Sequence, residues 1–213
     1  MTQDTSFAPD DLAAPVALAE ALTCLDLEPA VSLPLLSAHA QRRLIGATTR
    51  LRYRPATPVI GTGANAVYQD FELCMAIPER SLLRAFASAL EALLNAALMR
   101  MEPRPLARPL HLNDAIVQRY PAGSSGITAH RDHLRYRDLV ALVTLSGAAR
   151  ICLCDDRAGS NQREIPCPPG HLLLMRAPGF AGRDERPFHF LDRVTRARLS
   201  LGLRHDARAG EPV

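Results

Sequence analysis

Residues 198–204 read Arg-Leu-Ser-Leu-Gly-Leu-Arg, an alternation of polar and apolar side chains with a period of two. Successive side chains of a β-strand point to opposite faces of its sheet, so this period predicts a strand. Its three leucines share one face, and the other face carries Arg198, Ser200, Gly202 and Arg204. That polar face either meets solvent or lines an internal cavity that holds an anion.

The same period runs through the second half of the chain. Short strands are predicted at residues 115–120, 126–130, 139–145, 150–154, 171–175, 188–191 and 197–204. Turn residues such as Pro121–Gly123 and Ser146–Gly147 separate most of them. Many short strands at this spacing are typical of a sandwich, a barrel or a jelly roll.

The first half of the chain has mainly helical periodicity. Helices are predicted at 11–25 and 78–101, with a weaker one at 35–45, whereas 50–53 and 66–75 look extended. Prolines 103, 105 and 109 then form a linker. Helices followed by strands predict an α+β protein whose helices pack outside its sheets. We expect one domain over residues 1–213, with a helix-rich region at 1–109 and a core at 110–206.

Composition excludes several classes of protein. The 213 residues include 25 basic side chains, all of them arginine, and 22 acidic ones, which gives a net charge of +3. The lack of lysine rules out Schiff-base and P-loop lysine mechanisms. The charge is too small to indicate a nucleic-acid binder by itself. No apolar run approaches the ~20 residues of a membrane helix, so we expect no membrane association.

The five cysteines match no C-x-x-C metal pattern, and their number is odd. We interpret them as reduced thiols of a cytoplasmic protein. Cys152 and Cys154 share one face of a predicted strand, where core packing is the expected role.

Residues 130–132 read His-Arg-Asp at the end of a predicted strand. Residues i and i+2 of a strand point to the same side, so His130 and Asp132 can reach one metal ion. The H-x-D pattern is common by itself, but His189 offers a third ligand from another predicted strand. Two imidazoles and one carboxylate leave three coordination positions open, as in the facial triad of non-haem Fe(II) oxygenases.

As a set, these residues resemble the 2-oxoglutarate/Fe(II)-dependent dioxygenases, and in particular the AlkB-like branch. The two arginines of the last strand resemble that branch's R-x-N-x-x-x-R motif, with Ser200 in place of the asparagine. Gln118-Arg119-Tyr120 resembles its N-x-Y motif, whose amide and phenol contact 2-oxoglutarate. The resemblance covers about residues 112–206.

The resemblance implies a double-stranded β-helix, a jelly-roll barrel with iron near its open end. His130, Asp132 and His189 would then bind Fe(II). Arg198 would pair with the distal carboxylate of 2-oxoglutarate, and Arg204 would lie near the carboxylate that chelates iron. Tyr120, with Gln118 and Ser200, would hydrogen-bond the same ligand. The implied reaction consumes 2-oxoglutarate and O2, releases succinate and CO2, and hydroxylates or dealkylates a substrate. The alternative is a non-catalytic metal-binding jelly roll of the cupin type.

The substrate stays open between alkylated nucleic acid and a small molecule or protein side chain. A flipped base would need aromatic side chains to stack on, and a phosphate backbone would need a basic track. Residues 1–109 include a possible substrate lid, and the densest basic stretch is Arg42, Arg43, Arg50, Arg52 and Arg54, the last three on one face of a predicted strand. A solvated edge strand explains the same stretch. The plausible stacking side chains are Tyr53, Tyr68, Phe71 and Tyr136.

Several polar side chains near the motifs have ordinary interpretations. His133 should point away from the metal, and His171 and His205 are expected to be strand-end residues. Arg131 and Arg135 flank the predicted site, where they either meet an anionic substrate or belong to a solvated loop.

Overall fold

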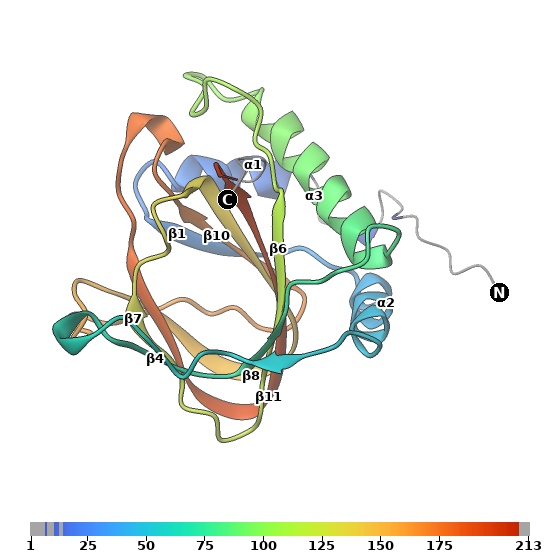
Figure 1. Ribbon diagram of the computed structural model, residues 1–213. Helices are drawn as coiled ribbons and strands as arrows, with labels where there is room; N and C mark the ends of the chain where they lie inside the picture. The colour runs from blue at the N-terminus through green and yellow to red at the C-terminus, as the bar shows by residue number, and fades with distance from the viewer. Residues whose placement is uncertain (1–6, 8–10, 13–14, 209–213) are drawn as a thin grey trace.

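The computed structural model describes residue 7, residues 11–12 and residues 15–208 of the chain. Within these residues the helices lie outside a barrel of antiparallel strands, which confirms the predicted α+β class (Figure 1). The helices are α1 (Pro15–Cys24), α2 (Ala38–Thr48) and α3 (Leu82–Leu98). The strands are β1 (Ala30–Pro34), β2 (Arg54–Pro55), β3 (Val59–Ile60), β4 (Val67–Asp70), β5 (Glu72–Cys74), β6 (Asp114–Tyr120), β7 (Gly126–His130), β8 (Tyr136–Cys154), β9 (Arg163–Glu164), β10 (His171–Arg176) and β11 (Phe188–Asp206).

Two long strands, β8 and β11, build both walls of the barrel. Each has 19 residues, and they pair with each other along most of their length. The first part of β11 pairs with β7, and its last part pairs with β6. The first part of β8 pairs with β10, and its end pairs with β9. One wall therefore has the order β1-β10-β8-β11-β6-β5-β2, and the chain forms a double-stranded β-helix.

The sequence predicted two separate strands in place of each long one, and that prediction was wrong. The predicted turn at Ser146–Gly147 lies inside β8, where Gly147 has φ +87° and a Cβ added to it would lie 2.1 Å from the Ala197 carbonyl oxygen. The register with β11 shifts repeatedly between Asp192 and Ser200. Glycine at positive φ suits a bulge or bend as well as a turn, so each strand bends from one wall into the other without ending.

The two faces of β11 separate as the alternation predicted. Leu199, Leu201 and Leu203 are buried against the helices in the larger core cluster. Arg198 and Ser200 point to the barrel interior and are 1% and 0% exposed. The polar face therefore lines an internal cavity and does not meet solvent.

Helix α3 covers the outer face of this wall. Its buried residues recur at helical spacing, among them Phe86, Leu90 and Leu94. The helix starts four residues later than predicted because the Ser81 side chain accepts a hydrogen bond from the Arg84 N–H and caps it. Figure 1 shows α2 beside α3 on the same side of the barrel. Helix α1 lies near the top of the view and contacts α3.

The region before residue 110 also differs from prediction at several places, and the short strands β2 and β3 were not predicted either. Strand β1 was not predicted, and it extends the sheet by pairing with β10. Residues 35–37 precede α2, whose N-cap is Ser37. Residues 50–53 form no strand, so Arg50 and Arg52 do not share a strand face with Arg54. Residues 13 and 14 of the first predicted helix lie outside the described residues.

All five cysteines are free thiols, as expected. Cys152 and Cys154 lie in a small cluster with Ala129 and Phe190, so both pack in the core. No helix among the described residues is long and apolar enough to cross a membrane.

Candidate metal centre

The three predicted metal ligands meet at one end of the barrel. His130 is the last residue of β7, and it lies opposite His189 of β11 in the strand register. Asp132 follows two residues later, in the loop that leads to β8. One potential ligand atom from each side chain lies within 4.8 Å of the other two. The imidazole rings are 4.3 Å apart between centroids and inclined at 52°.

Backbone hydrogen bonds orient both imidazoles. Nδ1 of His130 lies 2.9 Å from the Thr128 carbonyl oxygen, and Nδ1 of His189 lies 3.1 Å from the Pro187 carbonyl oxygen. A carbonyl only accepts, so each Nδ1 carries a proton, and in the neutral form of the ring Nε2 is the nitrogen with the lone pair. The backbone therefore selects, for each neutral imidazole, the tautomer that can bind a metal through Nε2.

The pKa shifts of His130 and Asp132 favour the protonation states that bind a metal. Burial, together with the neighbouring His189, lowers the pKa of His130 to about 4, so this imidazole is neutral at pH 7. Burial tends to raise the pKa of Asp132, but the Arg204 guanidinium and the two histidines outweigh it and hold that pKa below its usual range. Neutral imidazole and ionised carboxylate are the states that a divalent metal requires.

Arg204 links Asp132 to β6. Its Nε lies 3.6 Å from Asp132 Oδ2, and its Nη1 lies 3.7 Å from Asp114 Oδ2. These distances describe ion pairs without good hydrogen bonds. The guanidinium also lies 5.0 Å from the centroid of Tyr136. Gly202 lies on the same strand face, where an added Cβ would lie 3.1 Å from Ile116 Cγ2 and 3.4 Å from Arg204 Nη1.

Arg198 is the most deeply buried charge of the barrel. Its Nη1 donates to Ser200 Oγ at 2.9 Å, and its Nη2 donates to Thr144 Oγ1 at 3.0 Å. No carboxylate of the described residues pairs with it, and burial lowers its pKa. Tyr120 lies across the strand pair from Arg198, with its ring centroid 5.7 Å from the guanidinium carbon. Burial raises the pKa of Tyr120 to about 12, so its hydroxyl stays protonated.

Seven of the eight site residues predicted from the sequence line one cavity inside the barrel: Gln118, Tyr120, His130, Asp132, His189, Arg198 and Arg204. The eighth, Ser200, is buried and holds the Arg198 guanidinium. Apolar side chains such as Leu142, Ile151 and Leu173 form the rest of the lining. The structure thus brings the predicted set together around a narrow, largely apolar space.

Sequence reasoning missed three residues of this site. Thr144 holds Arg198, Asp114 pairs with Arg204, and Tyr136 packs against Arg204. Tyr136 is one of the four side chains expected to stack on a base, but its ring packs against the Arg135 and Arg204 guanidinium groups. None of the three lies in a motif, and only the pairing of β8 and β6 with β11 brings Thr144 and Asp114 to the site.

The other histidines and arginines near the motifs lie outside the metal set. His133 is exposed, and its Nδ1 accepts a hydrogen bond from the Arg135 N–H. His171 bonds Ser32 at the start of β10. His205 is a buried strand-end residue that pairs with Asp138 at 2.5 Å. Arg135 forms an ion pair with Asp206, whereas Arg131 is exposed over the Phe188 ring.

Comparison with solved structures gives the wider context of this site. A prolyl hydroxylase of Trichoplax adhaerens, solved with a peptide fragment of the hypoxia inducible factor oxygen degradation domain, is similar over 99% of this chain and 100% of its own, with a TM-score of 0.65 and 13% identity. A prolyl-4-hydroxylase of Pseudomonas putida is similar over 88% of this chain and 98% of its own, at TM-score 0.61 and 19% identity. The chain has the fold of the 2-oxoglutarate/Fe(II) oxygenases.

A third structure with this fold contains ligands. HygX of Streptomyces hygroscopicus, solved with nickel, 2-oxoglutarate and hygromycin B, is similar over 87% of this chain and 85% of its own, with a TM-score of 0.58 and 12% identity. No family profile and no curated protein sequence matches the chain. The likeness therefore concerns the fold, and the chemistry has to be argued from the side chains of this chain.

Proposed function

We propose that the protein is a 2-oxoglutarate- and Fe(II)-dependent oxygenase. The observation that carries the proposal is Arg198, a fully buried cation with no carboxylate partner among the described residues, in the same cavity as two histidines and an aspartate. A buried charge without a counter-ion is costly. A dicarboxylate that reached from the metal ligands to Arg198 would neutralise it.

The donor set fits Fe(II). His130, Asp132 and His189 would hold the ion from one side and leave the opposite positions open. When bound, iron with 2-oxoglutarate and O2 supplies the oxidising chemistry that hydroxylates or dealkylates a substrate and releases succinate and CO2. The protein orients the ligands and surrounds them with apolar walls that exclude water.

Arg198, Tyr120, Arg204 and Gln118 would contact 2-oxoglutarate in the cavity. Arg198 would bind the distal carboxylate in a fork, because Ser200 and Thr144 fix the plane of its guanidinium. The Tyr120 phenol keeps its proton and would donate a hydrogen bond to the same ligand. Arg204 would meet the carboxylate that chelates iron, beside Asp132. Gln118 lies opposite Ser200 in the strand register and faces the same cavity.

The arrangement also supports the AlkB-like assignment, which we keep as part of the proposal. Arg198 and Arg204 of β11 face the cavity, and Gln118 and Tyr120 of β6 lie opposite Ser200 and Arg198. The substrate is a separate matter from this assignment, because the cofactor residues say nothing about what is oxidised.

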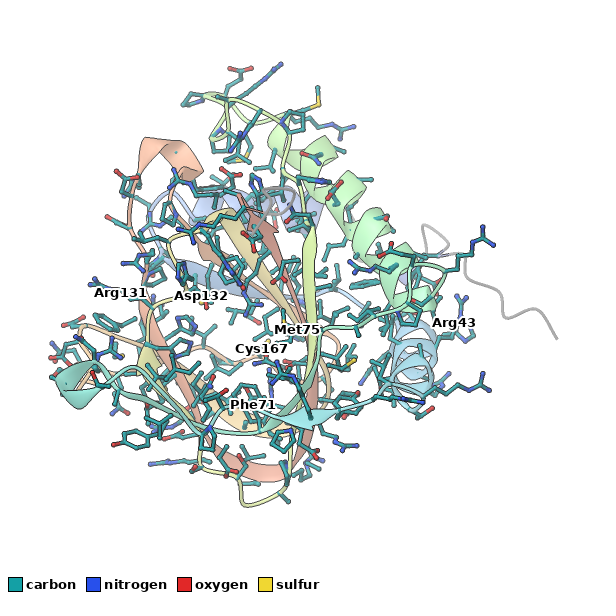
Figure 2. All side chains as sticks on the ribbon, in the orientation of Figure 1. Arg43, Phe71, Met75, Arg131, Asp132 and Cys167 are labelled. Atoms are coloured by element: carbon teal, nitrogen blue, oxygen red, sulfur yellow. The ribbon has the colours of Figure 1, made fainter. Side chains whose placement is uncertain are left out.

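Two observations favour a small molecule or a protein side chain over nucleic acid as the substrate. The first concerns the aromatic side chains, because Phe71 stacks on Tyr120 in the core and Tyr53 packs against Arg119. Tyr68 is the one exposed side chain among the four considered for base stacking. The second concerns the basic stretch, because Figure 2 shows Arg43 on the opposite side of the molecule from Asp132.

The free thiols support a reducing compartment, and we propose a cytoplasmic location.

Spectroscopy tests the proposal directly. Anaerobic addition of Fe(II) and 2-oxoglutarate should give a weak visible charge-transfer band. The band should be lost in His130→Ala and Asp132→Ala and kept in His133→Ala, a matched control because His133 is exposed and next to Asp132. Well-folded protein without the band would contradict the proposal. Metal binding that does not depend on 2-oxoglutarate would favour the non-catalytic jelly roll instead.

A further inference from the structure

A second cavity, of about 730 Å³, lies outside the metal centre. Its lining includes Arg131, Arg186, Pro187 and Phe188, residues that adjoin the candidate ligands in sequence. A smaller cavity lies beside both spaces, because it shares the lining residues Asp132 and His189 with the metal-centre cavity and Arg186 and Pro187 with the outer cavity. A substrate seated in the outer cavity would therefore lie next to the residues that hold the metal.

The side chain of Arg131, which lines the outer cavity, packs on an aromatic ring. Its guanidinium carbon lies 4.1 Å from the centroid of Phe188, the residue that precedes His189. Arg131 itself lies between two candidate ligands in sequence, and its side chain is exposed. Among the described residues no acidic side chain pairs with it. A cation stacked on a ring keeps its N–H edge free to bind an anion.

Arg186 lies on the other side of Asp132. Its Nη1 donates a hydrogen bond to the Asp132 backbone carbonyl at 2.9 Å. In the part of the chain that the structure describes, no carboxylate pairs with this guanidinium either. Arg131 and Arg186 are therefore both cations without an acidic partner among the described residues.

The other two arginines that line the outer cavity are paired with acidic side chains. Arg176 pairs with Glu185 at 2.8 Å, and Arg163 pairs with Glu28 at 2.6 Å. Asp155 accepts a hydrogen bond from Asn161 at 2.7 Å. Asp184 is exposed and has no partner within the described ranges. The free positive charge is therefore concentrated beside the metal ligands.

We propose that Arg131 and Arg186 bind the anionic group of a compact substrate, a carboxylate or a phosphate, and thereby direct a neighbouring C–H bond to the metal. This inference rests on the proposed oxygenase function and narrows its substrate class. A polyanion such as nucleic acid fits less well, because Asp155 and Asp184, which have no cationic partner among the described residues, border the same cavity and would repel a second phosphate.

Paramagnetic broadening tests the inference. The protein would be loaded with Mn(II) and saturating 2-oxoglutarate, so that Arg198 is occupied, and titrated with phenyl phosphate, benzoate, benzyl alcohol or benzylamine. The proton linewidths of each probe report its proximity to the metal, and Zn(II)-loaded protein gives the diamagnetic baseline. A short single-stranded oligonucleotide is the polyanion arm of the same titration.

We expect phenyl phosphate or benzoate to bind about tenfold or more tightly than the neutral and cationic probes, as one charge-assisted contact allows. Arg131→Gln should lose about tenfold in affinity, and Asp184→Asn should gain affinity. Arg186→Gln should also weaken anion binding, measured at saturating Mn(II) because Arg186 contacts Asp132. Arg163→Gln is the matched control, since Arg163 lines the same cavity but is paired with Glu28, and it should behave like the wild type.

The outcomes separate the two proposals. If the Fe(II)/2-oxoglutarate band is absent, the proposed function fails and this inference fails with it. If the band is present but the probes bind equally, or Arg131→Gln binds anions as well as the wild type, the inference alone is overturned. Tighter metal-proximal binding of the oligonucleotide than of phenyl phosphate would also overturn it, in favour of a nucleic-acid substrate.

Discussion

Arg204 Nε lies 3.6 Å from Asp132 Oδ2, and both atoms are buried without a hydrogen-bond partner among the described residues. The guanidinium keeps the aspartate ionised, but the pair is too long to satisfy either atom. Each atom is therefore free to gain a partner, a metal ion for the carboxylate and an anionic ligand for the guanidinium.

We expect Arg204→Gln to move the pH dependence of metal binding upward. Arg204 lowers the pKa of Asp132, so its removal lets burial raise that pKa, and the carboxylate then needs a higher pH to ionise. Calorimetric titration with Mn(II) between pH 5 and 8 would show the higher midpoint. Arg135→Gln is the control, because Arg135 also packs on Tyr136 but pairs with Asp206. An unchanged midpoint in Arg204→Gln would contradict the prediction.

The metal-free protein should lose stability in mild acid through His130. Its pKa is about 4 in the folded state and about 6.5 in the unfolded chain. Between these values the unfolded state binds more protons, so the free energy of unfolding falls as pH drops from 6.5 toward 4, by at most about 1.4 kcal/mol per pH unit from this residue. Urea unfolding at several pH values measures the slope. His130→Gln should flatten it and His133→Gln should not; equal slopes in all three proteins would refute the assignment.

The sequence predicts the features of this site that depend on a single strand, but not those that depend on the pairing of separate strands. The alternation at 198–204 correctly predicted which side chains of β11 share a face, because the period of two is a local property of the backbone. The positions of Thr144 and Asp114 depend on the register of β8 and β6 against β11, which no single segment encodes. For the same reason β1 was missed, because its place is defined by pairing with β10.

Gly126 should tolerate no side chain. It has φ +81°, and an added Cβ would lie 1.9 Å from the Leu191 carbonyl oxygen, where β7 and β11 begin to pair. We expect Gly126→Ala to separate these strands, to cost more than about 2 kcal/mol of unfolding free energy, and to weaken metal binding through His130 and His189. Gly123→Ala is the matched control, because Gly123 has φ +83° but open space around it. It should cost about 1 kcal/mol, the backbone strain alone. Denaturant unfolding of both variants gives the comparison, and equal losses would show that the close approach to Leu191 is unimportant.

Arg198→Met should separate stability from ligand binding. A buried cation replaced by an apolar side chain of similar length often leaves a protein as stable or more stable, so the thermal midpoint of the ligand-free variant should equal or exceed that of the wild type. Addition of 2-oxoglutarate with Mn(II) should raise the midpoint of the wild type, because a ligand stabilises the state that binds it. In the variant the rise caused by 2-oxoglutarate should disappear, while the rise caused by Mn(II) alone remains, since the ligands His130, Asp132 and His189 are intact. Arg198→Lys keeps the charge but cannot reach both Ser200 and Thr144 with a planar fork, and we expect it to retain only a weak response to 2-oxoglutarate. A full 2-oxoglutarate response in Arg198→Met would show that Arg198 does not bind the cofactor, because the dicarboxylate would then be held without this cation.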